Sequence, residues 1–192
     1  MKASQVKDTT PIKPLKEGNI VFLAKLPEYT EGDKGNSYKI EWVDKEGKVF
    51  SQTILDPFTP SASIPDNLVN AGYNKMFRIF RAYMQPEAYN TFSEIDIPDL
   101  KTAIATFTKM VAPDWANVET TLILGNKKYD GYLGLPTFTE FISTAYAPVT
   151  LEYPENELSV EYVQNPTKPR APRAGATPDQ ENKPKGNVND DV

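Results

Sequence analysis

The chain has 192 residues and a net charge of −5, and it contains neither cysteine nor histidine. These absences exclude disulfides and most zinc sites, and they remove the Cys–His and Ser–His pairs on which many enzymes depend. We therefore expect a protein that is not an enzyme and that carries no metal or cofactor.

Composition divides the chain into three parts. Residues 1–17 are polar, with two prolines and four lysines, and predict a flexible N-terminal arm. Residues 18–163 contain all 2 Trp, 10 Tyr and 9 Phe, and they suffice for a single globular domain. Residues 164–192 hold five prolines and no aromatic residue, which predicts a disordered tail.

The first half of the domain predicts strands. An apolar run over 19–26 ends at Pro27, before a loop at 28–37 that is predicted by its Gly, Asp and Asn. Apolar and charged residues alternate over 37–43, and the turn 44–48 separates them from a second strand at 49–55. This pattern is typical of an antiparallel hairpin.

Helical periodicity appears in the middle of the chain. The clearest helix covers 97–111, where Leu100, Ile104 and Phe107 recur on one side. Residues 75–85 place apolar side chains on one side of a helix and cations on the other, although their Phe, Ile and Tyr also suit a strand. Periodicity favours the helix there, and a short helix is expected from Pro65.

In the second half of the domain, apolar residues again recur at every second position. Residues 117–125 and 128–134 predict a hairpin, and 135–146 predict a short helix or an ordered loop. A closing hairpin is expected from 149–153 and 158–163. The expected fold class is therefore α+β and β-rich, with an antiparallel sheet or a partly open barrel around one clear amphipathic helix.

Three stretches interleave aromatic residues with Lys and Arg, as single-stranded nucleic-acid sites do. Aromatic rings can stack on bases while the cations neutralise phosphates. The predicted nucleic-acid contacts are Lys39, Trp42, Lys45, Lys48, Lys75, Arg78, Arg81, Lys127, Lys128, Tyr129 and Tyr132. The alternative for each stretch is a buried aromatic core beneath solvated cations.

Acidic residues are the main catalytic option that the composition leaves. Glu94, Asp96 and Asp99 cluster before the expected helix, where carboxylates are more typical of caps and dipole partners than of catalysis. Asp130 has the sequence context of a turn residue.

Charge is sorted along the tail. Lys168, Arg170 and Arg173 lie near the domain, whereas Asp190 and Asp191 form an acidic tip. Such a tip can recruit basic protein partners or fold back over a basic groove, and a solubilising terminus without a partner is the alternative.

A small β-rich body with aromatic and basic hairpins and an acid-tipped tail resembles small single-stranded-DNA-binding proteins, including phage-encoded ones. The segment 121–142 is also similar to part of some phage proteins. The resemblance implies an OB-like barrel, single-stranded DNA as the partner, and replication proteins as partners of the tail. The tip NDDV lacks the terminal aromatic residue of the cellular family, and the body is net acidic.

The leading hypothesis is a phage-type accessory protein that binds single-stranded DNA in the cytoplasm. The alternative is an auxiliary capsid or tail protein of a virion that acts through protein contacts, and oligomers fit either hypothesis. A small carboxylate-dependent enzyme is a third hypothesis. No stretch approaches the roughly 20 apolar residues of a membrane span, so no membrane partner is expected.

Overall fold

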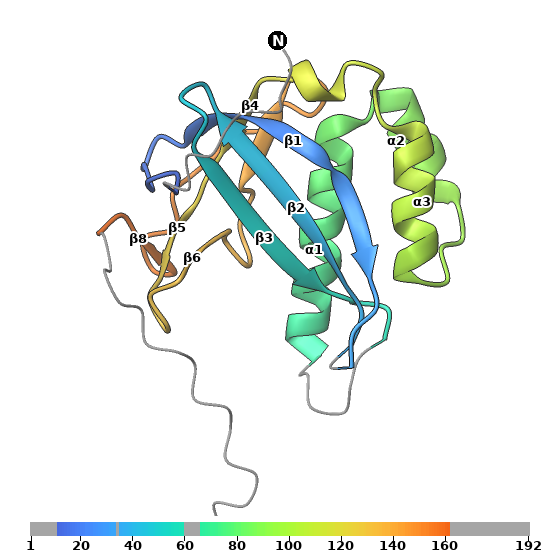
Figure 1. Ribbon diagram of the computed structural model, residues 1–192, viewed down its shortest axis with the longest axis horizontal. Helices are drawn as coiled ribbons and strands as arrows, with labels where there is room; N and C mark the ends of the chain where they lie inside the picture. Colours follow the sequence, from blue (N-terminus) through green and yellow to red (C-terminus); the bar gives the residue numbers. More distant parts are fainter. Residues whose placement is uncertain (1–10, 34, 60–65, 162–192) are drawn as a thin grey trace, which may run out of the picture.

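The computed structural model describes residues 11–33, 35–59 and 66–161. Over these residues the fold is α+β, with two antiparallel sheets and three α-helices (Figure 1). The larger sheet has the order β3-β2-β1-β4-β7 and consists of β1 (Asn19–Thr30), β2 (Ser37–Asp44), β3 (Val49–Leu55), β4 (Thr120–Leu122) and β7 (Ile142–Thr144). The smaller sheet has the order β6-β5-β8 and consists of β5 (Gly125–Lys127), β6 (Leu133–Gly134) and β8 (Leu158–Ser159).

The helices all lie between β3 and β4 in the chain. They are α1 (Asp66–Tyr83), α2 (Pro86–Glu94) and α3 (Leu100–Met110), followed by the 3₁₀ turn η1 (Trp115–Asn117). Figure 1 shows α1 crossing behind the large sheet, with α2 and α3 on one side of it and the small sheet on the other. Among the described residues, α1 therefore covers one face of the large sheet and no helix covers the other, the pattern that alternating strands predict.

The hairpin predicted at 37–55 is confirmed as β2 and β3. Tyr38 and Ile40 are buried, whereas Lys39 between them is exposed, as the alternation requires. The turn is closed by Asp44, whose Oδ1 accepts the backbone N–H of Glu46 and of Lys48 at 2.9 and 2.8 Å.

Residues 75–83 of the segment 75–85 are helical, as its periodicity favoured, and they continue the short helix expected from Pro65 into the single helix α1. Its buried residues recur at helical spacing: Met76, Ile79, Phe80 and Tyr83. The helix predicted at 97–111 is confirmed as α3. Asp99 caps it by accepting the N–H of Thr102 at 2.7 Å, so this carboxylate has a structural role.

Three strand predictions are wrong. The strand expected at 117–125 is divided between β4, which pairs with β1 and β7, and β5, which pairs with β6 and β8. Pro27 does not end β1, which continues to Thr30. The pairing with β2 shifts its register between Lys25 and Glu28, and such an irregularity accommodates a residue without an N–H to donate. Residues 149–153 form no strand, and β8 pairs with β5 instead of closing a hairpin with them.

The described end of the predicted arm packs on the domain. Ile12 is buried at 2 % exposure, Pro11 forms a bridge with Val49, and Lys16 forms an ion pair with Glu155. Residues 1–10 and the predicted tail from 164 onward lie outside the described residues. The sheets of the described chain form no closed barrel, because β3 and β7 remain the two edges of the larger sheet.

Candidate nucleic-acid interface

Trp42 is a core residue. Its side chain is fully buried, stacks on Phe50 with ring centroids 5.7 Å apart, and donates from Nε1 to the Tyr83 hydroxyl at 2.9 Å. That hydroxyl also pairs with Thr120 Oγ1 at 2.9 Å, so the chain of bonds joins β2, α1 and β4. A ring with no exposed face cannot stack on a base. Trp42 is therefore not available as a nucleic-acid contact, because it lies on the face of β2 that packs into the core.

The lysines of the first predicted stretch lie near glutamates. Lys39 forms an ion pair with Glu41, Lys48 forms one with Glu46, and Lys45 lies 3.5 Å from Glu119. Ion pairs as exposed as these typically contribute about 0–1 kcal/mol, so a phosphate could compete with the carboxylates. The pairing nevertheless cancels the local positive charge that would attract a nucleic acid.

The cations of the second stretch line one side of α1. Lys75, Arg78 and Arg81 recur every three residues, which keeps them on neighbouring turns of the same side. Arg78 donates to Glu140 Oε1 at 3.2 Å and to the carbonyl of Thr139 at 3.0 Å. Arg81 donates from Nη2 to Glu140 Oε2 at 3.1 Å. One carboxylate therefore holds two arginines and fixes the loop before β7 against α1.

Lys127, from the third stretch, is buried at the end of β5 in the small sheet. Its Nζ donates to Glu157 Oε1 at 2.7 Å and to Thr137 Oγ1 at 2.9 Å. Burial acts to raise the pKa of Glu157, but hydrogen bonds from Lys127 and Thr137 outweigh it and lower that pKa. Lys127 thus stabilises the small sheet and is not a surface contact.

Lys75 lies close enough to this network to respond to it. Burial lowers the pKa of Lys75 to about 8, Lys127 and Arg78 act in the same direction, and Glu157 opposes them. The four cations Lys75, Arg78, Arg81 and Lys127 face two carboxylates, Glu140 and Glu157. Among these described groups two positive charges are left over, which makes this side of α1 attractive to anions.

The tip of the β5–β6 hairpin presents exposed side chains. Tyr129 is 76 % exposed and Tyr132 is 37 % exposed, and Lys128 between β5 and that tip is exposed as well. Asp130 is a turn residue, as its context predicted, since its Oδ1 accepts the N–H of Tyr132 at 2.9 Å. Burial, Asp130 and Glu157 together raise the pKa of the Tyr129 hydroxyl.

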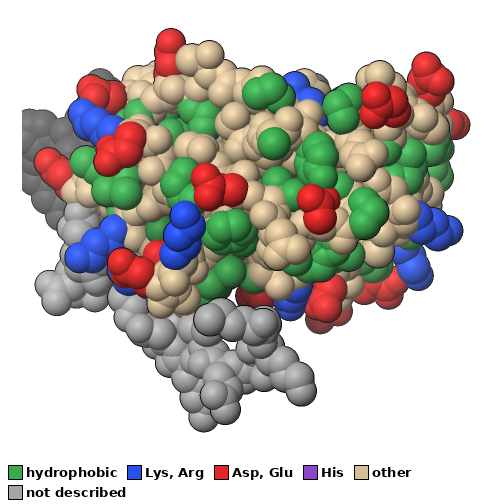
Figure 2. All heavy atoms as spheres, turned by 90° about the horizontal axis from the view of Figure 1, so that it is seen from above, with side chains coloured by type: hydrophobic (Ala, Val, Ile, Leu, Met, Phe, Trp, Pro, Cys, Tyr) green, Lys and Arg blue, Asp and Glu red, His purple; other side chains and the backbone are tan. Residues whose placement is uncertain are grey.

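The structure thus brings two of the three predicted stretches together and separates the third. The α1 cations and the β5–β6 hairpin meet through the loop 135–141, whereas Lys39, Lys45 and Lys48 belong to the β2–β3 hairpin. On the face that Figure 2 shows, basic and acidic side chains are interspersed and do not separate by sign. Local pairing therefore decides where positive charge is in excess.

Sequence reasoning missed three residues of this region. Phe138 is 66 % exposed next to Arg78, Glu140 pairs with both arginines, and Tyr89 lies on the unpredicted helix α2. Glu140 is the one acidic residue between Asp130 and Glu152. Its isolation in an otherwise uncharged run is the sequence feature that could have indicated a specific ion pair.

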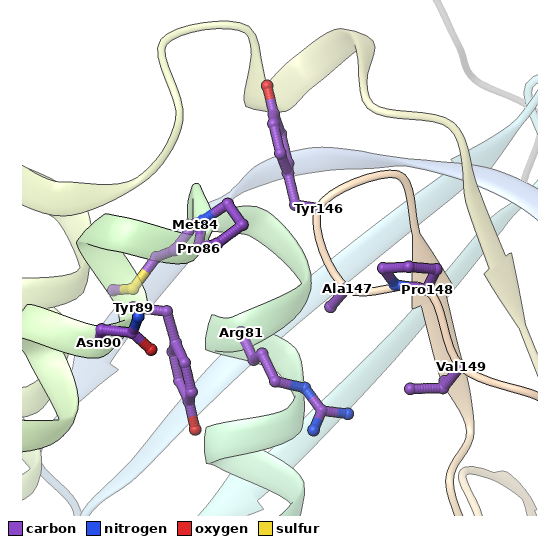
Figure 3. A pocket seen from close by; sticks show the side chains of 9 residues that line it. All are labelled: Arg81, Met84, Pro86, Tyr89, Asn90, Tyr146, Ala147, Pro148 and Val149. Carbon is purple, nitrogen blue, oxygen red and sulfur yellow. The ribbon is translucent and has the colours of Figure 1, made fainter.

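Two adjoining hollows run along α1, and Arg81 and Tyr89 line both of them. One has a volume of about 240 Å³ and is shown in Figure 3; the other, of about 220 Å³, is also lined by Arg78 and Glu140. The shared residues make the two hollows a single groove, which we call the Arg81 groove.

The described residues hold no group of three or more acidic side chains that could bind a metal ion. In the same part of the chain, no helix combines the length and the apolar character that crossing a membrane requires. Asp190 and Asp191 of the predicted acidic tip lie outside the described residues.

No protein-family model matches the sequence, and comparisons with curated proteins and with solved structures found no match either.

Proposed function

We propose that this protein binds single-stranded DNA as a non-enzymatic accessory protein of phage type. The contact surface in this proposal is the α1 side of the domain, with the tip of the β5–β6 hairpin beside it. The observation that carries the proposal is the excess of cations along α1 next to the exposed rings of Tyr129 and Phe138. Cations next to stacking platforms are what a single strand requires.

Lys75, Arg78 and Arg81 would then attract phosphates, and Lys128 would add a further charge at the hairpin. Tyr129, Tyr132 and Phe138 would stack on bases, each base contributing about 1–3 kcal/mol. The sheet lysines Lys39, Lys45 and Lys48 are given a minor, long-range role, because each has a glutamate within ion-pair distance.

An OB-like arrangement is part of the proposal. The strand order supports it: β1 pairs with both β2 and β4, and the helices enter between β3 and β4. Partly open five-stranded barrels of the OB type commonly bind oligonucleotides. The tail would recruit replication proteins through Asp190 and Asp191, and the place of action would be the cytoplasm of a host cell.

The exposed rings also favour the second candidate function, a virion assembly protein. Tyr129 at 76 % and Phe138 at 66 % exposure are large apolar surfaces that a protein partner could cover as readily as a base could. Stable oligomers without salt-dependent DNA binding would identify this function.

The deciding experiment is fluorescence anisotropy of a labelled single-stranded oligonucleotide titrated with the full chain at two salt concentrations. Contacts to roughly three phosphates would weaken binding about tenfold to thirtyfold between about 50 and 200 mM salt. No binding at the lower salt would overturn the proposal and leave the virion function in its place.

A double variant locates the surface. Tyr129→Ala with Phe138→Ala should weaken oligonucleotide binding at least about tenfold, since two stacking contacts are lost. The matched control is Ile95→Ala with Lys109→Gln, which removes exposed groups near α2 and on α3 and should leave affinity unchanged. Equal losses in both variants would contradict the proposed surface.

A further inference from the structure

The larger hollow of the Arg81 groove combines one cation with mostly apolar walls. Its lining residues are Arg81, Met84, Pro86, Tyr89, Asn90, Tyr146, Ala147, Pro148 and Val149, and no carboxylate is among them. Figure 3 shows the end of the Arg81 side chain extending from α1 into the space between Tyr89 and Val149. The hollow thus presents a guanidinium to whatever enters it.

Arg81 has unused hydrogen-bonding capacity. Within the described residues its single hydrogen bond runs from Nη2 to Glu140, although a guanidinium can donate five. Its Nε is buried without a partner, which makes the group costly to hold in place. An anion at the exposed end of the guanidinium would accept charge-assisted hydrogen bonds from its Nη atoms, and such bonds are about twice as strong as neutral ones.

The opposite wall suits a flat ring. Tyr89 packs one face against Phe92, with ring centroids 6.4 Å apart and an interplanar angle of 22°, and it also lines the groove. The Tyr146 hydroxyl donates to Asp114 at 2.6 Å and is directed away from Arg81 in Figure 3. Tyr146 therefore forms a rim, and Tyr89 is the ring beside the guanidinium.

We propose that this hollow holds one nucleotide of a bound single strand, with its phosphate on Arg81 and its base against Tyr89. The inference rests on the proposed function and assigns it a specific site. Because its volume of about 240 Å³ is below the usual range for drug-sized ligands, we place the base and the phosphate in the hollow and the sugar at its mouth. The adjoining hollow, lined by Arg78, continues the path for the next phosphate.

The Asn90 side chain gives a sensitive probe of this site. It lines the hollow from the exposed side of α2, so Asn90→Asp introduces a negative charge without changing the shape. A carboxylate there repels a phosphate on Arg81. Asn117→Asp is the matched control, since Asn117 is exposed in η1 and lines neither hollow.

The test is an amide NMR titration of the full chain with deoxyadenosine monophosphate, deoxyadenosine and inorganic phosphate in separate arms. We expect the nucleotide to shift the amides of residues 81–90 and 146–149, and the nucleoside and phosphate to shift them less at equal concentration. Shifts confined to other residues, or equal shifts from phosphate alone, would overturn the inference.

Oligonucleotide anisotropy with the variants separates this inference from the proposed function. Tyr89→Leu and Asn90→Asp should each weaken binding about tenfold, and Asn117→Asp should not. If the wild type binds DNA and both groove variants bind equally well, the site is wrong and the proposed function stands. If the nucleotide binds in the groove but no oligonucleotide binds, the proposed function is wrong and the groove is a mononucleotide site.

Discussion

The open face of the large sheet and the α1 side of the domain have similar compositions but different electrostatics. On the sheet and its turn, Lys39, Lys45 and Lys48 each lie within ion-pair distance of a glutamate. Along α1, one glutamate serves both Arg78 and Arg81. The number of cations in a stretch therefore says less about its partners than the number of carboxylates that the fold places beside them.

The aromatic residues of the two regions differ in the same way. Trp42 points into the core, whereas Tyr129 and Phe138 point into solvent. Only the second arrangement leaves ring faces available for a ligand. Four sets of variants test this contrast.

Trp42→Ala should lower the free energy of unfolding by about 3–5 kcal/mol, because it empties a core position and leaves the Tyr83 hydroxyl with one partner fewer. Chemical denaturation measures this change. The milder Trp42→Phe keeps a ring in the core and should retain full oligonucleotide affinity under folding conditions. A stable Trp42→Phe variant that had lost DNA binding would show that the ring is a contact after all.

Lys75→Met should raise the free energy of unfolding at pH 7 by about 1–3 kcal/mol. The pKa of Lys75 is lowered to about 8 in the folded chain from an ordinary 10.5, so its protonated form is disfavoured by folding. That penalty is complete below pH 8 and is relieved as the pH rises from about 8 to 10.5, where the unfolded chain binds more protons.

The measurement is urea denaturation of both chains at several pH values between 7 and 10.5. The gain from Lys75→Met should shrink across that window, and Lys109→Met, at an exposed position on α3, should show no such trend. A gain that stays constant with pH would show that Lys75 acts through packing and not through its charge.

Glu140→Gln should have opposite effects on stability and on binding. Losing the carboxylate that holds Arg78 and Arg81 should cost about 1–2 kcal/mol of stability, and it should strengthen oligonucleotide binding about threefold to tenfold by removing a negative charge from the groove. Denaturation and anisotropy on the same preparation measure both. Glu41→Gln, which removes the ion-pair partner of Lys39 on the sheet, is the control. Equal gains in affinity from Glu41→Gln and Glu140→Gln would contradict the proposed difference between the two regions.

Lys39→Gln with Lys45→Gln should have the smallest effect. Both side chains are exposed and lie near glutamates, so oligonucleotide affinity should change less than about twofold and the denaturation midpoint should stay in place. A tenfold loss of affinity would move the interface to the sheet.

Local patterns predicted the elements that depend on neighbours in the chain. The alternation of 37–43 predicts β2, and the spacing of Leu100, Ile104 and Phe107 predicts α3, because each pattern repeats within a few residues. The helix α2 was not predicted, since its nine residues are mostly polar and only Phe92 is buried. The partner of β8 was misassigned, because a two-residue strand carries too little pattern to specify its neighbour.

By itself, the sequence determined the absence of thiol and imidazole chemistry, the α+β class, and which residues are candidates for a basic and aromatic surface. The tertiary structure decided which candidates are usable. It buried Trp42 and Lys127, and it joined Arg78 to Glu140 across a sequence separation of 62 residues. The physical reason is that periodicity is a local property of the chain, whereas burial and ion pairing depend on contacts that only the complete fold creates.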